Sequence, residues 1–286
     1  MTTYRVPNLA KKYTNYDMIQ RHTEIPNFPD GRVRLLEFFL NRGPVWSAEH
    51  SELYSLVTAL VQMGLDTHEM IDVHEEDLKE QEMRSRQLKV LGGDYFSARF
   101  YQLLAAAGQI SIVASLSEGI CIVNERKMNL YNRMRRQLVT AEEYVNESVQ
   151  LKKQLFLSFQ SMISPGEVSL FDRLLSAFSL FDMLIEEIEH VRDMERSRYR
   201  LAYYQILSHT DSSVKEALNR NELEPNEWIQ LTLKHRTQEF LTDKLRHSVN
   251  DTERFIENEV SDQVVVQEIM KMMESYRTYR APGKVV

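Results

Sequence analysis

"RQLKVLGGDYFSARFYQLLAAAG", residues 86–108, has the apolar spacing of one long helix but contains two adjacent glycines. A glycine inside a helix costs about 1 kcal/mol relative to alanine, and the whole chain has only nine glycines. Gly92 and Gly93 therefore indicate a place where another backbone comes too close for a Cβ atom. The stretch predicts a fold that depends on close helix packing.

An acid, Asp94, follows the two glycines, and its neighbours one helical turn away are apolar or small. A polar group that is buried without a partner costs about 1–3 kcal/mol, so an acid on such a face should be paired. We therefore expect Asp94 to face packed surface and to pair with Arg86, Arg99 or His68.

The composition of the chain favours an all-α protein. Its 286 residues include few glycines and prolines, while residues that lose little rotamer freedom in a helix are abundant. No alternation of apolar and polar residues between turn signals indicates a strand. We expect one all-helical domain over 1–286, with an irregular segment rich in helix breakers at 1–45. The expected helices are a short one at 33–40, one within 46–66 that has Ser47 as its N-cap, and others at 86–107, 109–135, 140–162, 167–190, 193–209, 211–220, 225–246 and 250–278.

Charge and cysteine content bear on the class of protein. The formal net charge of −7 disfavours a dedicated nucleic-acid-binding protein, because neutralising phosphates requires a broad basic surface. The sequence shows neither a secretory leader nor 18 uninterrupted apolar residues, so we expect a soluble, cytoplasmic protein without a transmembrane segment. The single cysteine, Cys121, lies in an apolar run and is expected to be a buried thiol.

Several familiar reaction types are excluded by residue spacing. The sequence contains no glycine-rich phosphate loop, no G-x-S-x-G, no paired C-x-x-C and no H-E-x-x-H. A di-iron carboxylate bundle needs E-x-x-H on two helices, and only Glu187 with His190 fits that spacing.

The acidic stretch "LDTHEMIDVHEED", residues 65–77, allows two interpretations. His68 and Asp72 lie one helical turn apart and extend an apolar stripe, with Glu69 and further acids nearby. The stretch is either a divalent-cation site or a hydrogen-bonded inner pair beside a solvated acidic loop. These residues alone leave both interpretations open.

The next predicted helix is unusually apolar around its circumference. Over 110–131 the apolar residues cover an arc of about 200°, against about 100° for an ordinary surface helix. Such a helix is either central to its own fold or packed on a second chain. Basic residues gather at 125–137 and 192–200. They could meet a diphosphate, a membrane surface or an acidic partner, but a solvated face of salt bridges is the commoner meaning.

Three stretches together resemble a known family. They are "LVQMGLDTHEMI" (60–71), "RQLKVLGGDYFSARFYQLLA" (86–105) and "IVNERKMNLY" (122–131). In this order they resemble the small subunit, component I, of two-component heptaprenyl and hexaprenyl diphosphate synthases. The polar motif residues that carry the resemblance are Asp66, His68, Glu69, Asp72, Arg86, Asp94, Tyr95, Glu125, Lys127 and Tyr131.

More distantly, the chain resembles the all-α fold of trans-prenyl diphosphate synthases. The catalytic chains of that superfamily carry D-D-x-x-D motifs that hold magnesium, and here Met70 and Val73 stand where two of the acids belong. The later stretch 178–190 also lacks D-D-x-x-D. Hard cations need several carboxylate oxygens, so the resemblance implies a chain with no catalytic residue, no metal and no cofactor of its own. Magnesium is expected in the catalytic partner.

The resemblance also implies a partner and a role. The partner is a large subunit with D-D-x-x-D motifs, and this chain would activate it and help set product length by lining the tunnel for the prenyl chain. The product would be hexaprenyl or heptaprenyl diphosphate, made from farnesyl and isopentenyl diphosphates for the menaquinone side chain. The residues expected at the interface are Gly92, Gly93, Phe96, Leu103, Val113, Leu116, Ile120 and Val123.

Two rival hypotheses remain at this level. One is a self-sufficient prenyl or terpene synthase with degenerate motifs, which would bind magnesium and diphosphate unaided. The other is a helical adaptor outside isoprenoid metabolism, which would keep an apolar partner surface without any link to a prenyl synthase.

Overall fold

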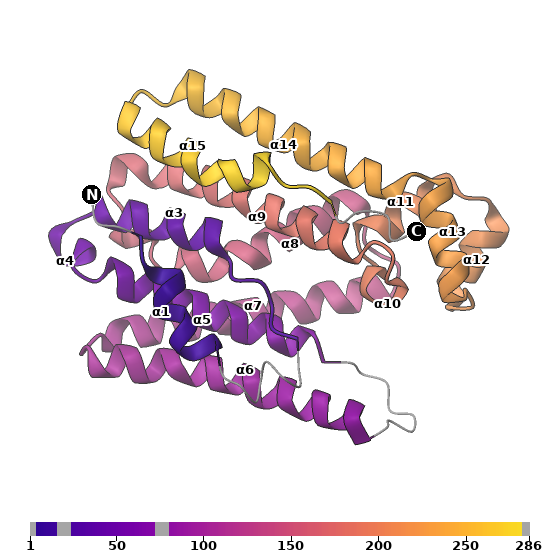
Figure 1. Ribbon diagram of the computed structural model, residues 1–286, viewed down its shortest axis with the longest axis horizontal. Coiled ribbons are helices and arrows are strands. Elements are labelled where there is room, and N and C mark those ends of the chain that lie inside the picture. Colours follow the sequence, from indigo (N-terminus) through magenta and orange to yellow (C-terminus); the bar gives the residue numbers. More distant parts are fainter. Residues whose placement is uncertain (1–3, 16–23, 72–79, 282–286) are drawn as a thin grey trace. The chain divides into compact units, whose positions relative to one another are not determined.

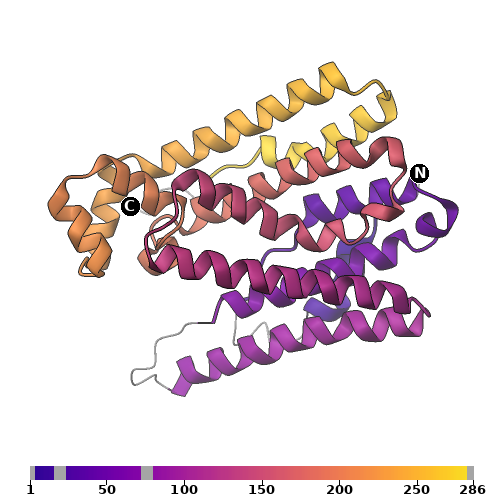
Figure 2. The same ribbon diagram turned by 180° about the vertical axis from the view of Figure 1, so that it is seen from behind.

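The computed structural model describes residues 4–15, 24–71 and 80–281. All regular elements within these ranges are helices, as the sequence predicts, and none of them is a strand (Figures 1 and 2). No helix in the described ranges is long and apolar enough to cross a lipid bilayer. The chain divides into two compact units, and each is described by itself.

The first unit comprises residues up to Ile122 together with Gln154–Asp172. Its central helix is α5 (Ser51–Glu69), which packs against α1 (Val6–Thr14), α3 (Asp30–Asn41) and α6 (Glu80–Ala106). The unit also includes α4 (Val45–Ala48), the first half of α7 (Ile110–Arg135), the last turn of α8 (Ala141–Leu157), the short 3-10 turns Gln160–Met162 and Pro165–Glu167, and the first residues of α9 (Val168–His190).

Close contact between α5 and α6 organises this unit. A Cβ atom on Gly64 of α5 would lie 2.5 Å from Ser97 Oγ and 3.0 Å from the carbonyl oxygen of Gly93 on α6. Gly64 and Gly93 therefore let the two helices approach more closely than larger residues allow. The aromatic core beside this contact includes Tyr54 and Phe159, whose ring centroids lie 5.4 Å apart.

The N-terminal region is more regular than the sequence suggests. Helices α1 and α3 occupy much of the segment expected to be irregular. Pro7 is tolerated because it lies at the start of α1, where its missing N–H has no helical partner. Ser47 is not an N-cap: α5 begins later, at Ser51, and the Ser47 hydroxyl donates instead to the carbonyl oxygen of Leu40 at 3.3 Å.

A buried acid, Glu37, lies on α3. Its side chain is 6% exposed, and its Oε2 has no hydrogen-bond partner among the residues described. Burial, with a smaller contribution from Glu52, raises the pKa of Glu37 to about 7, while Arg34 and Arg5 act in the opposite direction. The first unit therefore contains a carboxyl group that is costly to ionise.

The second unit comprises Val123–Lys153 and residues from Arg173 onward. Its core includes Phe178 and Phe181 of α9, against which the ring of Tyr276 packs at 5.4 and 5.1 Å. Its remaining helices are α10 (Met194–Ser197), α11 (Leu201–His209), α12 (Ser212–Arg220), α13 (Pro225–Lys234), α14 (Thr237–Glu259) and α15 (Gln263–Arg277).

Several helix boundaries differ from those expected, for local backbone reasons. The helix expected at 225–246 is divided because Arg236 has a left-handed φ of 51°, which separates α13 from α14. The helix expected at 250–278 is divided at Asp262, whose side chain caps α15 by accepting from the backbone N–H of Val264. Helix α6 begins at Glu80, ahead of the expected start, and α8 ends at Leu157, short of the expected end.

The contact between α5 and α6 yields a stability prediction. The change Gly64→Leu should lower the melting temperature of the isolated chain by several degrees, because overpacking at a backbone contact costs about 1–3 kcal/mol. Gly166→Leu is the matched control, since no atom lies within 4 Å of a Cβ placed there. Thermal unfolding followed by circular dichroism measures both, and equal melting temperatures for the two variants would contradict the packing argument.

The buried acid yields a pH prediction. The folded-state pKa of Glu37 lies above its unfolded value, so the stability it contributes is present below about pH 4.5 and lost as the pH rises through about 7. Glu37→Gln should therefore stabilise the chain at pH 8, by about 3 kcal/mol at most, and by much less at pH 5. Denaturant unfolding at both pH values tests this, with Glu216→Gln on the surface of α12 as control. A pH-independent difference would contradict it.

Candidate functional site

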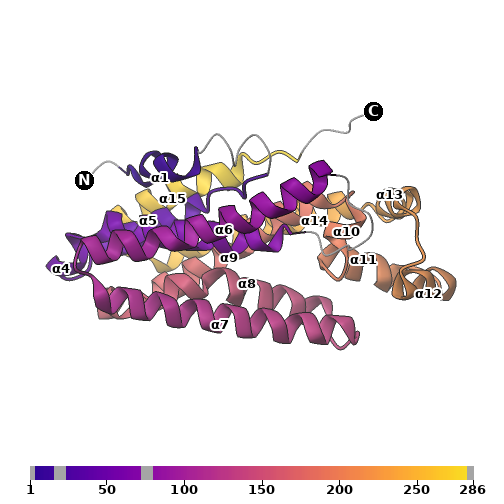
Figure 3. The same ribbon diagram turned by 90° about the horizontal axis from the view of Figure 1, so that it is seen from below.

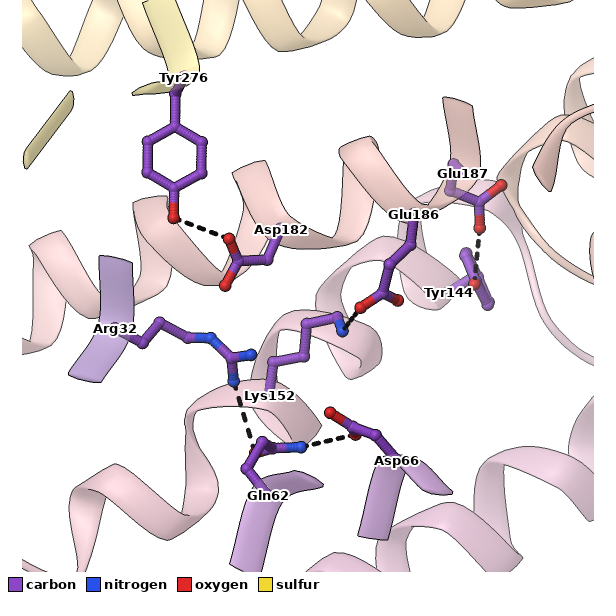
Figure 4. Close-up of polar contacts among 9 residues, drawn as sticks. All are labelled: Arg32, Gln62, Asp66, Tyr144, Lys152, Asp182, Glu186, Glu187 and Tyr276. Atoms are coloured by element: carbon purple, nitrogen blue, oxygen red, sulfur yellow. Dashed lines mark hydrogen bonds and ion pairs between the residues drawn. The ribbon is translucent and has the colours of Figure 1, made fainter. Parts of the chain in front are cut away.

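The motif at the end of α5 is held by a polar chain that the sequence did not reveal. Gln62 donates through Nε2 to Asp66 Oδ1 at 2.8 Å and accepts from Arg32 Nη1 at 3.5 Å (Figure 4). Arg32 is only 2% exposed, and its guanidinium lies 5.2 Å from the ring centroid of Phe156. The spacing of Gln62 and Asp66, four residues apart on one helix, was the available signal for half of this arrangement.

The C-terminus of α5 is held by a lysine. Lys89 of α6 is 8% exposed, and its Nζ donates to the carbonyl oxygen of Met70 at 2.6 Å. Glu69 is exposed at the same helix end, while Asp72 and Val73 lie outside the described residues. A cation thus occupies the end of the helix where the carbonyl groups lack partners, as the helix dipole favours.

His68 and Asp94 form the polar contact between α5 and α6. His68 Nε2 lies 3.4 Å from Asp94 Oδ1, so one of the three partners expected for Asp94 is confirmed. Asp94 is 68% exposed, however, and does not face packed surface as expected. A Cβ on Gly93 would lie 2.6 Å from His68 Nε2. Gly93 therefore admits α5 of the same chain.

The acids of α9 are bound by other side chains of the second unit. Asp182 accepts from the Tyr276 hydroxyl at 2.7 Å, and Glu186 accepts from Lys152 Nζ at 2.5 Å (Figure 4). These contacts occur in the stretch that lacks D-D-x-x-D.

Glu187 is the most buried of these acids, with 3% of its surface exposed. It accepts from the Tyr144 hydroxyl at 2.8 Å and from the backbone N–H of Ala202 at 3.2 Å. Burial raises the pKa of Glu187, against the opposing effect of Arg200, and it raises the pKa of Tyr144 well above its usual value. Glu187 thus joins α8, α9 and α11 through hydrogen bonds.

In the described parts of the chain, no three His, Cys, Asp or Glu side chains are grouped so as to hold a metal ion.

Several apolar residues are exposed on α6 and on the first half of α7, beside exposed polar residues such as Asp94 and Glu118, and this set of apolar residues is here called the α6–α7 face. The two helices are joined across it by the hydroxyl groups of Tyr101 and Ser117, which lie 3.1 Å apart. Leu91 is 62% exposed and Ile110 is 64% exposed. Cys121 is also exposed, which corrects the expectation of a buried thiol. The exposed members of the face are Val90, Leu91, Ala98, Tyr101, Ala105, Ile110, Ala114 and Cys121.

None of the residues expected at the interface is fully exposed in this chain. Gly92, Gly93, Phe96, Leu116 and Val123 are buried within this chain, and Leu103, Val113 and Ile120 are half-buried. The wide apolar arc of α7 is divided, because one side of the helix packs inside the chain and another side is exposed. The motif does not indicate which side of each helix faces inward.

The remaining motif residues are divided between exposed and half-buried positions. Tyr95 is half-buried, and its ring centroid lies 4.5 Å from the Arg99 guanidinium. Tyr131 is exposed, with its ring centroid 5.7 Å from the Arg135 guanidinium. Arg86 and Lys127 are half-buried and Glu125 is exposed.

Two basic residues of α7 form salt bridges with α8, as the commoner interpretation predicted. Arg126 lies 3.4 Å from Glu147, and Arg133 lies 2.7 Å from Glu143. The hydrogen bonds from the backbone N–H of Thr140 and from Arg133 hold the pKa of Glu143 below its usual value.

Comparison with protein families gives one match over most of the chain. The family described as heptaprenyl diphosphate synthase (HEPPP synthase) subunit 1 matches residues 16–232. Heptaprenyl diphosphate synthase component 1 of Geobacillus stearothermophilus is 34% identical over 91 residues, which are 32% of this chain and 39% of that protein. The matched stretch thus spans less than half the length of this relative.

Comparison with solved structures gives the same fold class. A polyprenyl synthase from Roseobacter denitrificans superposes with a TM-score of 0.63 at 12% identity, covering 95% of this chain and 93% of that one. A decaprenyl diphosphate synthase from Rhodobacter capsulatus gives 0.60 at 15% identity, covering 96% and 94%. At these identities the likeness concerns the fold alone.

Proposed function

This chain belongs to the heptaprenyl diphosphate synthase subunit 1 family, and from that premise we propose that it is the non-catalytic component of a two-component trans-polyprenyl diphosphate synthase. The observation that carries the proposal is that the acids of α9 form hydrogen bonds with other side chains of this chain. Asp182, Glu186 and Glu187 each accept a hydrogen bond from a tyrosine or lysine of this chain. In addition, Met70 stands at a position of the first aspartate-rich motif, where its thioether is a poor ligand for magnesium.

The chemistry would then belong to a partner carrying D-D-x-x-D motifs. Ionisation of an allylic diphosphate requires cations that draw charge from the leaving group, and magnesium prefers carboxylate oxygens and phosphates. The partner would hold the magnesium and bind farnesyl and isopentenyl diphosphates. This chain needs no cofactor in that scheme.

The α6–α7 face is the surface we propose for docking that partner. Its apolar residues are exposed on two long helices that are joined to each other by a hydrogen bond. Exposed apolar residues that are grouped in this way favour association with a partner. The earlier interface assignment to these helices is thus retained, while the contact residues move to their outward side.

We propose that this chain helps to control product length by limiting the space available to the growing prenyl tail. In the assembled enzyme this chain would help to wall the apolar tunnel that receives the growing prenyl tail, and the tunnel's depth would stop elongation at hexaprenyl or heptaprenyl diphosphate. Such a product would supply the menaquinone side chain in the cytoplasm.

The activity prediction separates this proposal from its rivals. The purified chain alone should not condense isopentenyl with farnesyl diphosphate, and adding the D-D-x-x-D chain of the same cell should give a hexaprenyl- or heptaprenyl-length product. Radiolabelled isopentenyl diphosphate with product separation by chromatography measures both. Magnesium-dependent activity of the chain alone would favour a self-sufficient synthase. Inactivity with every prenyl synthase chain of the cell would favour an unrelated adaptor.

The docking prediction concerns Leu91. Leu91→Glu should weaken association with the D-D-x-x-D component at least about tenfold, because binding would desolvate a charge at an apolar contact. Leu233→Glu in α13 is the control, since Leu233 is 49% exposed and lies outside the proposed face. Surface plasmon resonance measures both affinities, and circular dichroism checks that both variants keep wild-type melting temperatures. Equal affinities of the two variants would show that the partner docks on another surface.

A further inference from the structure

Helix α1 is held on the first unit by a small apolar contact. It lies beside α5 at the edge of the unit (Figure 3) and packs against α5 and α3. Of its nine residues, Val6 and Ala10 are buried. An isolated helix of this length is marginal in water, so α1 depends on this contact. Elements with few buried apolar contacts open locally, while the core stays folded.

Two side chains just before α1 fasten it to its neighbours. The Tyr4 hydroxyl donates to Asp30 Oδ1 of α3 at 2.8 Å. The Arg5 guanidinium donates to both carboxylate oxygens of Glu52 on α5, at 3.1 and 3.2 Å. The Arg5 side chain is 65% exposed, and an ion pair at such a position contributes little stability. These polar contacts orient α1 without holding it firmly.

The buried acid Glu37 of α3 lies beside this attachment. Its carboxyl group is close enough to Tyr4 and Arg5 to interact electrostatically with both. Neither supplies a hydrogen bond to its Oε2, which has no partner among the residues described, because both donate to other acids. With 6% of its surface exposed, Glu37 also has little access to water. An ionised carboxylate at this position is therefore poorly stabilised while α1 is docked.

Charged groups around all three helices act on Glu37. Glu52 of α5 opposes its ionisation, while Arg34 of α3 and Arg5 before α1 favour it. Burial outweighs the two arginines and raises the pKa of Glu37 to about 7, from an ordinary value of about 4.5. The Arg34 guanidinium also lies 5.6 Å from the ring centroid of Tyr4, so one cation acts on both the acid and the attachment of α1.

We propose that α1 is a pH-sensitive latch, which stays docked on α3 and α5 while Glu37 is neutral and opens when this acid is ionised. Opening would let water solvate the carboxylate whose Oε2 has no hydrogen-bond donor in the docked state. Helix α5 is buried along most of its length, so it stays folded when the latch opens. The latch belongs to this chain alone and does not depend on a catalytic partner.

Rising pH should open the latch. Because the pKa of Glu37 is about 7 when α1 is docked and about 4.5 when the carboxyl group is hydrated, docking is strongest below about pH 4.5. It weakens as the pH rises between these two values and levels off above about pH 7. The equilibrium constant for opening should therefore increase about tenfold between pH 6 and pH 8.

Hydrogen–deuterium exchange of the full chain, followed by mass spectrometry of peptides from α1 and α5, tests the latch. After correction for the intrinsic pH dependence of amide exchange, α1 should exchange about tenfold faster at pH 8 than at pH 6, while α5 exchanges equally at both. Glu37→Gln should remove this difference, because an amide does not ionise. Glu216→Gln, on the exposed surface of α12, is the matched control and should behave like the wild type.

Three results would overturn the inference. Equal corrected exchange of α1 at both pH values would show that no latch opens. An unchanged pH dependence in Glu37→Gln would assign the opening to another group. Joint loss of protection by α1 and α5 at pH 8 would show that the whole unit unfolds and that α1 does not open by itself. The comparison of α1 with α5 in the wild-type chain remains decisive even if Glu37→Gln does not fold.

Discussion

The first unit depends on how closely α5 approaches α6. Gly64 and Gly93 remove the side chains that would hold the two helices apart, and Ser97 and His68 fill the space beside them. The same approach brings His68 to Asp94 and places Lys89 at the C-terminus of α5. It also determines which side of α6 faces outward, so that Leu91 and Tyr101 are exposed on a helix whose inner side carries Phe96. One backbone contact therefore sets both the core and the apolar surface of this unit.

The two units use acidic side chains in different ways. In the first, Asp66 ends a polar chain that begins at the buried Arg32, while Glu37 is buried without such support. In the second, Glu187 receives hydrogen bonds from a tyrosine and from the backbone at the start of α11. A buried acid with these hydrogen bonds holds neighbouring helices together. Replacing its hydrogen-bond donor would leave a buried charge or a buried polar group without a partner, which destabilises the fold.

Sequence patterns predicted the helical fold, the close helix approach at Gly93 and salt bridges on α7, because each depends on local spacing or composition. They did not predict the outward side of α7, since an arc as wide as its apolar residues cover has no unique inner direction. The pairing of Tyr144 with Glu187 and of Tyr276 with Asp182 joins residues far apart in the chain, and no local spacing marks them. Ser47 is not the cap of α5 because it lies inside the separate short helix α4, and α5 begins only at Ser51.

The exposure of Cys121 has a chemical consequence. It is the chain's single cysteine, and it lies among apolar residues of the α6–α7 face. A thiol-reactive fluorophore would therefore attach at one position, within the surface that we propose the partner covers, without any engineered residue. The same exposure leaves the thiol accessible to oxidants in the chain alone, and a partner that covers this face would shield it.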